Sequence, residues 1–452
     1  MTSGRRQQRR RGRNWYILLI ALFLLGTMLG IHFSTRSAGR TGQDRLPSEA
    51  PGGTTPAASP QQPAETASPP ASASEAPSKA PSDPPSEAPS EAPSETPSDP
   101  PSEPPPDEPS DEIRELLDSM SLREKICQMF VVFPSDLTGV EKATQAGETT
   151  RQALEQYPVG GLLYDASNMV SRDQVREMLE NTQSFSKLPL ILTCDEEGGR
   201  VARLMSTVGT TKIGPMLDYA HLGPEAAMAN AKTIASDMAA LGFNTDFAPV
   251  ADVWSNPDNT VIGDRAYSRD FAQAAQLIPA AVEGFHAGGV ACTLKHFPGH
   301  GDTAEDSHSG AAYVNKTLDR LRQEELLPFR AGIAVGADLV MLGHLTVPEV
   351  DSAPAPFSHT LVTELLREEL GFYGVVITDS LQMKAVTDSY SSGEAAVKAV
   401  QAGVDLLLCP EDPEAAVAAL LNAVEAGEIT EERIDESVLR VLELKERRGI
   451  LS

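Results

Sequence analysis

The stretch KHFPGHGDTAEDSHSG, residues 295–310, gathers three histidines, one lysine and three acidic residues in sixteen positions. One residue separates Asp306 from His308, so in an extended backbone both side chains leave on the same side and can hydrogen-bond. A carboxylate that holds one imidazole nitrogen leaves the other nitrogen free to exchange a proton near neutral pH. We therefore interpret Asp306 and His308 as an acid/base dyad.

An acid needs a partner group at the reacting carbon, and Asp379 in VVITDSL, residues 375–381, is the candidate. It follows an apolar run that is typical of a strand. A rigid strand end suits a nucleophile or a charge that stabilises a developing cation. Aspartate is also a good helix N-cap, so this residue taken alone leaves both interpretations open.

A metal site is the chief chemical alternative for the histidine-rich stretch. His296, His300, Asp306 and His308 are all of ligand type, but their spacing matches no standard zinc motif such as H-E-x-x-H. We expect neither a metal nor an organic cofactor. An acid/base dyad should be indifferent to a chelator, whereas a metal site should not be.

The elements that must position these groups are eight short apolar runs that alternate with helical patterns from Asp111 onward. The runs are MFVVF (129–133), VGGLLY (159–164), LPLILTCDEE (188–197), FNTDFAPVADV (243–253), GVACTLKHF (289–297), ADLVMLGHL (337–345), GVVITDSL (374–381) and GVDLLLCP (403–410). Continuous apolar strands separated by helices indicate parallel pairing with both faces covered. Eight such units predict a (β/α)₈ barrel over residues 111–452.

An open doubly wound sheet is the alternative fold. No G-x-G-x-x-G turn follows the first run, and polar residues recur after several runs rather than at one switch point. Asp195 lies near the end of the third run, Lys295 and His296 near the end of the fifth, and Asp379 near the end of the seventh. In a barrel the carboxyl ends of the strands meet at one rim, which is where we expect the site.

The amino-terminal part predicts a membrane anchor and a linker. Trp15 to Phe33 is almost wholly apolar and about long enough to span a bilayer, and six arginines precede it. We predict a basic cytoplasmic tail over 1–13, a transmembrane helix over 14–33, a disordered Pro/Ser/Glu-rich linker over 34–110, and an extracytoplasmic catalytic domain. A cleaved signal peptide is the competing interpretation.

Charge indicates which partners to expect, and cysteine content indicates which covalent links to expect. Residues 111–452 carry 27 basic and 52 acidic side chains, and such a surface repels phosphate backbones, so nucleic acid is not expected as a partner. The four cysteines are far apart in sequence, and we expect buried thiols. One long-range disulfide is the alternative, since the domain is expected to be extracytoplasmic.

Four ordered segments carry a resemblance to a known family. They are DEEGGRVARL (195–204), NPDNTVIGDRAYS (256–268), KHFPGHGDTAEDSH (295–308) and GVVITDSLQM (374–383). Together they closely resemble glycoside hydrolase family 3, specifically its β-N-acetylglucosaminidase branch, over roughly residues 112–450.

The resemblance implies a retaining exo-hydrolase that removes terminal β-linked N-acetylglucosamine from a glycan such as peptidoglycan or its fragments. It implies that Asp379 is the nucleophile and that His308, assisted by Asp306, is the acid and then the base. The sugar-binding residues that it implies are Asp195, Arg203, Arg265, Lys295 and His296. The alternatives are another family 3 activity, such as that of a β-glucosidase or β-xylosidase, and a non-catalytic wall-binding protein.

Overall fold

A computed structural model describes residues 109–304 and 310–451. The predicted transmembrane helix, most of the linker, and the dyad Asp306 and His308 lie outside these ranges. Among the helices of the described ranges, none is both long enough and apolar enough to cross a membrane.

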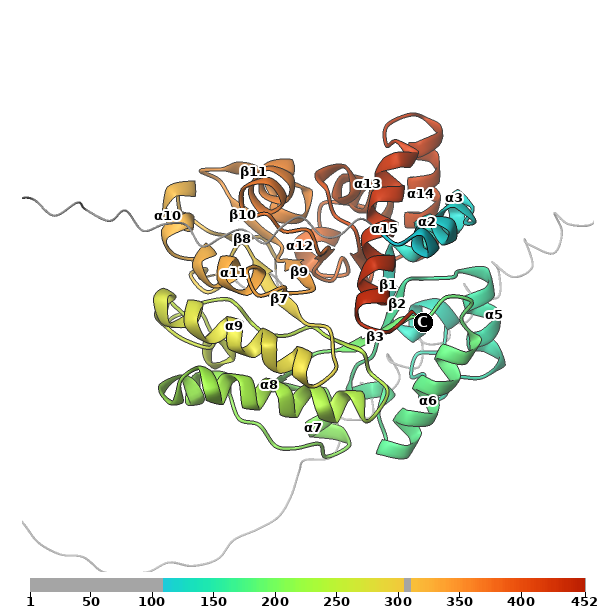
Figure 1. The fold of residues 1–452 in the computed structure, drawn as a ribbon. Coiled ribbons are helices and arrows are strands. Elements are labelled where there is room, and N and C mark those ends of the chain that lie inside the picture. The colour runs from blue at the N-terminus through green and yellow to red at the C-terminus, as the bar shows by residue number, and fades with distance from the viewer. Residues whose placement is uncertain (1–108, 305–309, 452) are drawn as a thin grey trace, which may run out of the picture. The chain divides into compact units, whose positions relative to one another are not determined.

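Eight parallel strands form a barrel (Figure 1). In chain order they are β1 (Phe130–Val132), β2 (Gly161–Leu163), β3 (Ile191–Cys194), β6 (Thr245–Asp246), β7 (Thr293–Phe297), β9 (Leu339–Leu342), β12 (Val375–Thr378) and β13 (Leu407–Leu408). One sheet has the order β13-β1-β2-β3-β6 and another β12-β9-β7. Parallel bridges join β6 to the segment of β7 and β12 to the segment of β13, which closes the ring.

Each of the eight barrel strands lies within one of the eight predicted runs, so the predicted barrel is confirmed and the open sheet is wrong. The strands are shorter than the runs because the polar ends of the runs belong to loops. The clearest case is the run 243–253, in which only Thr245 and Asp246 are in strand β6. Pro249 in this run cannot donate a backbone hydrogen bond to a ladder.

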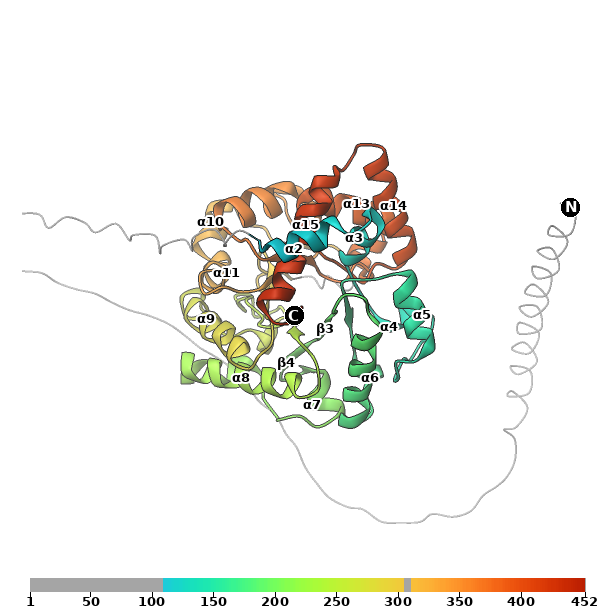
Figure 2. The same cartoon turned by 45° about the vertical axis from the view of Figure 1, so that its right-hand side comes forward.

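Helices surround the barrel (Figures 1 and 2). They are α2 (Asp111–Asp118), α3 (Leu122–Gln128), α4 (Pro134–Thr138), α5 (Glu148–Gln156), α6 (Arg172–Phe185), α7 (Arg203–Thr207), α8 (Pro224–Ala239), α9 (Phe271–Ala287), α10 (Leu318–Gln323), α11 (Leu326–Ile333), the π-helix η5 (Thr360–Glu369), α12 (Lys384–Thr387), α13 (Ser392–Ala402), α14 (Pro413–Glu425) and α15 (Glu431–Arg447). Side-chain caps define several of their starts. Asp270 accepts from the Gln273 N–H at the start of α9, and Thr430 accepts from the Arg433 N–H at the start of α15.

The barrel interior is filled by side chains that alternate along the strands. It contains Val131, Leu163, Ile191, Phe247, Ala291, Leu339, Met341, Val375, Ile377, Leu406, Leu408 and Cys409. Val441 and Leu444 of α15 join the same cluster, so α15 packs against the strands. The larger cluster of buried residues packs the outer face of the strands against the helices.

Short extra strands follow some of the barrel strands. The hairpin of β4 (Glu196–Gly198) and β5 (Val201–Ala202) follows β3. A three-stranded sheet is built from β8 (Ala312–Tyr313), β10 (Leu345–Val347) and β11 (Asp351–Pro354), which lie in the connections after β7 and β9. These additions place more backbone at the carboxyl end of the barrel, where the sequence places the candidate site.

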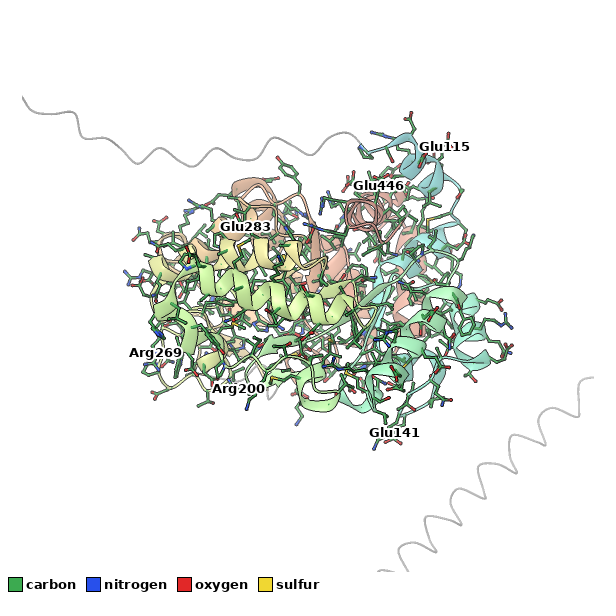
Figure 3. All side chains as sticks on the ribbon, turned by 60° about the horizontal axis from the view of Figure 1, so that its bottom comes forward. Glu115, Glu141, Arg200, Arg269, Glu283 and Glu446 are labelled. Carbon is green, nitrogen blue, oxygen red and sulfur yellow. The ribbon has the colours of Figure 1, made fainter. Side chains whose placement is uncertain are left out.

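Charged side chains cover the outside of the barrel, and Figure 3 labels six exposed ones, Glu115, Glu141, Arg200, Arg269, Glu283 and Glu446. The four cysteines are instead buried and free. Buried thiols were predicted and are confirmed, and the alternative of a disulfide is wrong.

Candidate active site

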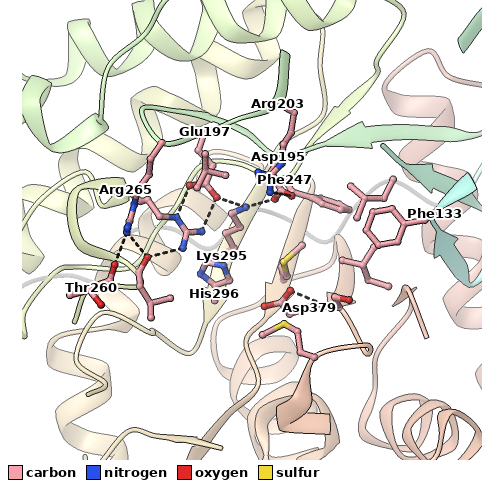
Figure 4. Close-up of a pocket in the computed structure, with 18 residues that line it drawn as sticks. Phe133, Asp195, Glu197, Arg203, Phe247, Thr260, Arg265, Lys295, His296 and Asp379 are labelled. Carbon is pink, nitrogen blue, oxygen red and sulfur yellow. Dashed lines mark hydrogen bonds and ion pairs between the residues drawn. The ribbon is translucent and has the colours of Figure 1, made fainter. Parts of the chain in front are cut away.

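A cavity of about 590 Å³ lies at the carboxyl end of the strands (Figure 4). Six predicted site residues fall within the described ranges, and all six line it: Asp195, Arg203, Arg265, Lys295, His296 and Asp379. They come from the connections after β3, β6 and β12 and from β7 itself. The barrel brings these distant segments together because the carboxyl ends of parallel strands share one rim.

Lys295 of β7 holds its ammonium group between two carboxylates. Its Nζ lies 2.8 Å from Asp195 Oδ1 and 2.6 Å from Glu197 Oε1. The Lys295 side chain is only 2% exposed, and burial by itself lowers its pKa. The two carboxylates outweigh burial and raise the pKa of Lys295, so the group stays charged and fixed in position.

Arg265 and Glu197 form a bidentate ion pair. Arg265 Nε donates to Glu197 Oε2 and Nη2 donates to Glu197 Oε1, both at 2.8 Å. Burial would raise the pKa of Glu197, but the charges of Arg265 and Lys295 hold it well below its usual range. A planar guanidinium bound through two donors has little freedom to turn, so this pair fixes the orientation of Arg265.

Arg203 and Asp195 make a looser contact. Arg203 Nη2 lies 3.5 Å from Asp195 Oδ2, and the two side chains are 36% and 24% exposed. A long and partly solvated pair is weak. These two residues therefore offer charged groups that a ligand can reach.

His296, next to Lys295 in β7, is held by the buried carboxylate of Asp252. His296 Nδ1 lies 2.6 Å from Asp252 Oδ2, and the His296 N–H donates to the same carboxylate at 3.1 Å. Burial would raise the pKa of Asp252, but His296 outweighs it and the pKa is lowered. The second carboxylate oxygen, Oδ1, accepts from the His300 N–H at 2.6 Å, so Asp252 also anchors the loop that follows β7.

Asp379 follows β12 directly and faces the same cavity (Figure 4). Its N–H donates to Leu342 O at 2.9 Å, which fixes the backbone beside the end of β9. Its Oδ1 accepts from the Ser380 N–H at 2.7 Å. No helix begins at Asp379, since α12 starts at Lys384, so the alternative of a helix N-cap does not apply.

Apolar side chains form another part of the lining. They are Phe133, Leu163, Val201, Phe247, Val261, Met341, Met383 and Leu408. A cavity with both a charged wall and an apolar wall suits a ligand that has many hydroxyl groups and an apolar ring face. A purely apolar ligand would match only one of the two walls.

The predicted dyad, Asp306 and His308, lies outside the described residues, so its role stays a prediction. The described start of its loop is anchored at the rim. Asn259 Nδ2 donates to His300 O at 2.7 Å, and the Thr303 hydroxyl lies 2.8 Å from His300 Nδ1. These contacts fix where the chain leaves the barrel toward residue 305.

Sequence reasoning placed Glu197 and Asp252 at the carboxyl rim of the predicted barrel but assigned no role to either residue. Both are acidic residues at the ends of predicted strand runs, and this signal was available in the sequence. The partners of these two residues could not be read from the sequence. Glu197 binds Lys295 of β7 and Arg265 of the connection after β6, and Asp252 binds the backbone and ring of His296. Such pairings depend on how the strands are arranged around the barrel.

A barrel with a charged cavity at its carboxyl rim is the architecture of (β/α)₈ enzymes in general, so the family is identified by sequence comparison. The model of the glycosyl hydrolase family 3 N terminal domain matches residues 121–444, and the chain belongs to this family.

Several relatives of the chain have names or solved structures. Beta-hexosaminidase A from Pseudoalteromonas piscicida is 35% identical over 324 residues, which are 65% of this chain and 54% of that protein. A beta-hexosaminidase from Stenotrophomonas maltophilia is 38% identical over 275 residues, which are 59% of this chain and 80% of that protein. A solved glycoside hydrolase family 3 beta-N-acetylglucosaminidase from Paenibacillus sp. has a TM-score of 0.69 and 41% identity, with 74% of this chain and 63% of that chain covered. The chain thus spans about half the length of the first of these relatives.

Proposed function

We propose that the protein is a retaining exo-β-N-acetylglucosaminidase that releases terminal, non-reducing β-linked N-acetylglucosamine. The observation that carries the proposal is the placement of Asp379 in one cavity with Lys295, Asp195 and Arg265. The names of the relatives support the choice of an N-acetylhexosamine over other sugars.

The two walls of the cavity suggest how a sugar is bound. Lys295, Asp195 and Arg203 bind hydroxyls and the acetamido group through charge-assisted hydrogen bonds, which are the strong ones. His296 serves the same purpose from the neighbouring position in β7. Phe133 and Phe247 provide apolar surface against which a ring face packs.

The reaction proceeds in two displacements. A carboxylate oxygen of Asp379 attacks the anomeric carbon while the protonated imidazole of His308 gives its proton to the glycosidic oxygen. The bond to the leaving alcohol breaks and a glycosyl ester forms on Asp379. His308 then takes a proton from water, the water oxygen attacks the anomeric carbon, and Asp379 is released as a carboxylate.

In this scheme Asp306 orients the imidazole of His308. An imidazole alternates between a cationic and a neutral form and never becomes an anion. It therefore does not repel the carboxylate of Asp379 during turnover, as a second carboxylate does when it is ionised. Within the same site, the carboxylate of Asp252 holds the imidazole of His296 in the way that we propose for Asp306 and His308.

A panel of nitrophenyl glycosides tests the activity. The N-acetyl-β-glucosaminide is the expected substrate, with the β-glucoside and β-xyloside turned over far more slowly. Asp379→Asn should abolish turnover, whereas Asp388→Asn, at an exposed position nine residues on, is the matched control and should not change it. Preferred cleavage of the glucoside or xyloside would favour another family 3 activity, and glycan binding without any turnover would favour a wall-binding protein.

We also propose that the segment Trp15–Phe33 anchors the protein in the cell membrane and that the linker carries the catalytic domain outside, where peptidoglycan or released muropeptides are the substrate. The apolar length of the segment and the arginines before it support this orientation. Membrane fractionation, with protease added to intact spheroplasts, tests it. Recovery of the full-length chain in the soluble fraction, or protection of the domain from protease, would contradict it.

A further inference from the structure

A cluster of three potential metal ligands lies at the amino-terminal ends of two neighbouring strands, at the opposite end of β7 from Lys295 and His296. His286 is near the end of α9, Cys292 directly precedes β7, and Asp338 directly precedes β9. Their ligand atoms all lie within 4.8 Å of one another. Cys292 and Asp338 are fully buried and His286 is partly buried.

The contacts in this cluster converge on one imidazole nitrogen. His286 Nε2 lies 2.9 Å from Asp338 Oδ2, 2.6 Å from Arg448 Nη2 and 3.6 Å from Cys292 Sγ. If Nε2 carries a proton, this N–H can donate to Asp338 but is opposed by the N–H of Arg448. If Nε2 carries no proton, its lone pair can accept from Arg448 but is opposed by the carboxylate oxygen of Asp338. No protonation state of His286 satisfies both short contacts.

We propose that His286, Cys292 and Asp338 form a structural zinc site. An imidazole, a thiolate and a carboxylate are the three ligand types that Zn²⁺ takes, and four-coordinate geometry leaves one position for water. A single ion at the point of convergence accepts the lone pair of Nε2 and neutralises Oδ2 at once. The conflict between the contacts of His286 Nε2 with Asp338 and with Arg448 is then removed.

The charges balance in this exchange. In the described arrangement Arg448 Nε lies 2.6 Å and Arg447 Nη2 lies 3.4 Å from Asp338 Oδ1, so two guanidinium groups face one carboxylate. When Zn²⁺ binds, Cys292 releases its proton to solvent, and the thiolate and the carboxylate together neutralise the ion. Arg448 and Arg447, which are 21% and 47% exposed at the end of α15, then turn toward solvent.

Two further features fit a metal site. The Cys292 N–H donates to Asp338 Oδ2 at 3.1 Å, and a hydrogen bond of this kind orients a ligating carboxylate. A cavity of about 290 Å³ is lined by His286, Arg447 and Arg448, among others, and provides a route for the ion. In (β/α)₈ barrels the amino-terminal end contributes to stability rather than to catalysis, so a structural role is expected.

The test is a Co²⁺ titration of the intact, metal-stripped protein. Co²⁺ bound by a thiolate absorbs strongly in the near ultraviolet, and Zn²⁺ should displace it. Cys292→Ser should lose this absorption, whereas Cys127→Ser, at another buried thiol outside the cluster, should retain it. His286→Gln is the second ligand variant and should bind Co²⁺ about tenfold more weakly or worse.

Arg448→Ala distinguishes a metal site from an ordinary ion-pair cluster. Its removal should lower the dissociation constant for Co²⁺, because the guanidinium no longer competes for Asp338 and His286. Zn²⁺ should raise the Tm of the wild type but not that of His286→Gln. Absence of the thiolate absorption in the folded wild-type protein, or its persistence in Cys292→Ser, would overturn the proposal, and weaker binding in Arg448→Ala would also contradict it.

Discussion

Asp379 and its surroundings carry the proposed chemistry at the scale of single residues. Its backbone N–H donates to Leu342 O at the strand end, and its carboxylate accepts a hydrogen bond from the Ser380 N–H. Lys295 and Arg265 are fixed in position by buried carboxylates rather than by solvent. Preorganised charges of this kind stabilise a transition state without having to reorganise during the reaction.

His308→Ala is predicted to slow hydrolysis in a way that depends on the leaving group. Glycosides with a poor leaving group, such as an alkyl alcohol, need protonation and should be cleaved roughly 10²–10⁴-fold more slowly. An activated nitrophenolate leaves without a proton, so formation of the glycosyl-enzyme should be much less affected. Single-turnover kinetics over a series of leaving groups measures this, and equal losses across the series would argue against His308 as the acid.

At the scale of elements, the site depends on contacts between loops that follow different strands. Glu197 in the β4–β5 hairpin binds Lys295 of β7 and Arg265 of the connection after β6. One buried carboxylate therefore joins three segments of the barrel rim. Removing one member of a buried ion pair leaves an uncompensated charge, which is costly.

Glu197→Gln is predicted to lower the free energy of unfolding by about 3 kcal/mol at pH 7. The pKa of Glu197 is depressed in the folded state, so its contribution to stability is complete above about pH 5 and is lost as the pH falls through the folded-state pKa. The difference between wild type and variant should therefore shrink in acid. Urea unfolding at pH 7 and pH 3 measures it, with exposed Glu141→Gln as the control, and a difference that grows in acid would contradict the assignment.

Gly301 tests the anchoring of the loop that carries the predicted dyad. A Cβ at this position would lie 1.7 Å from Val253 O, so the backbone must move. Gly301→Ala should lower kcat by roughly 10²-fold, because a displacement of about 1 Å can have an effect of this size. Gly147→Ala, where no atom lies within 4 Å of the added Cβ, is the control. Unchanged activity of Gly301→Ala would show that the loop start does not position the dyad.

The eight strands could be predicted from the sequence because each is a short apolar run bounded by glycine, proline or charged residues. The positions of Lys295, His296 and Asp379 could be predicted because each follows or ends such a run. The pairing of Glu197 with Arg265 could not, since it joins residues 68 positions apart whose proximity depends on the register of the strands. The β4–β5 hairpin was also missed, because EEGGRVA has no alternating apolar pattern.

At the scale of the whole molecule, the barrel is held by its hydrophobic interior and by helix packing, without any disulfide. Burial raises the pKa of Cys127 to about 11 and also raises those of Cys194, Cys292 and Cys409. Buried thiols with raised pKa values are poor nucleophiles.

The folded protein is therefore predicted not to react with a disulfide reagent such as dithionitrobenzoate over minutes, and to react at all four cysteines in denaturant. Added reductant should leave the Tm unchanged. Rapid labelling of any thiol in the native protein, or a Tm that falls on reduction, would show that the thiols are accessible or paired.

The most direct test of the central claim is to trap the glycosyl-enzyme. His308→Ala mixed with an activated N-acetylglucosaminide should form the covalent intermediate quickly and hydrolyse it slowly, because the base is missing. Intact-protein mass spectrometry should then show one added N-acetylhexosamine residue, and peptide mapping should place it on Asp379. Turnover with no adduct at any time, or an adduct on a residue other than Asp379, would contradict this account.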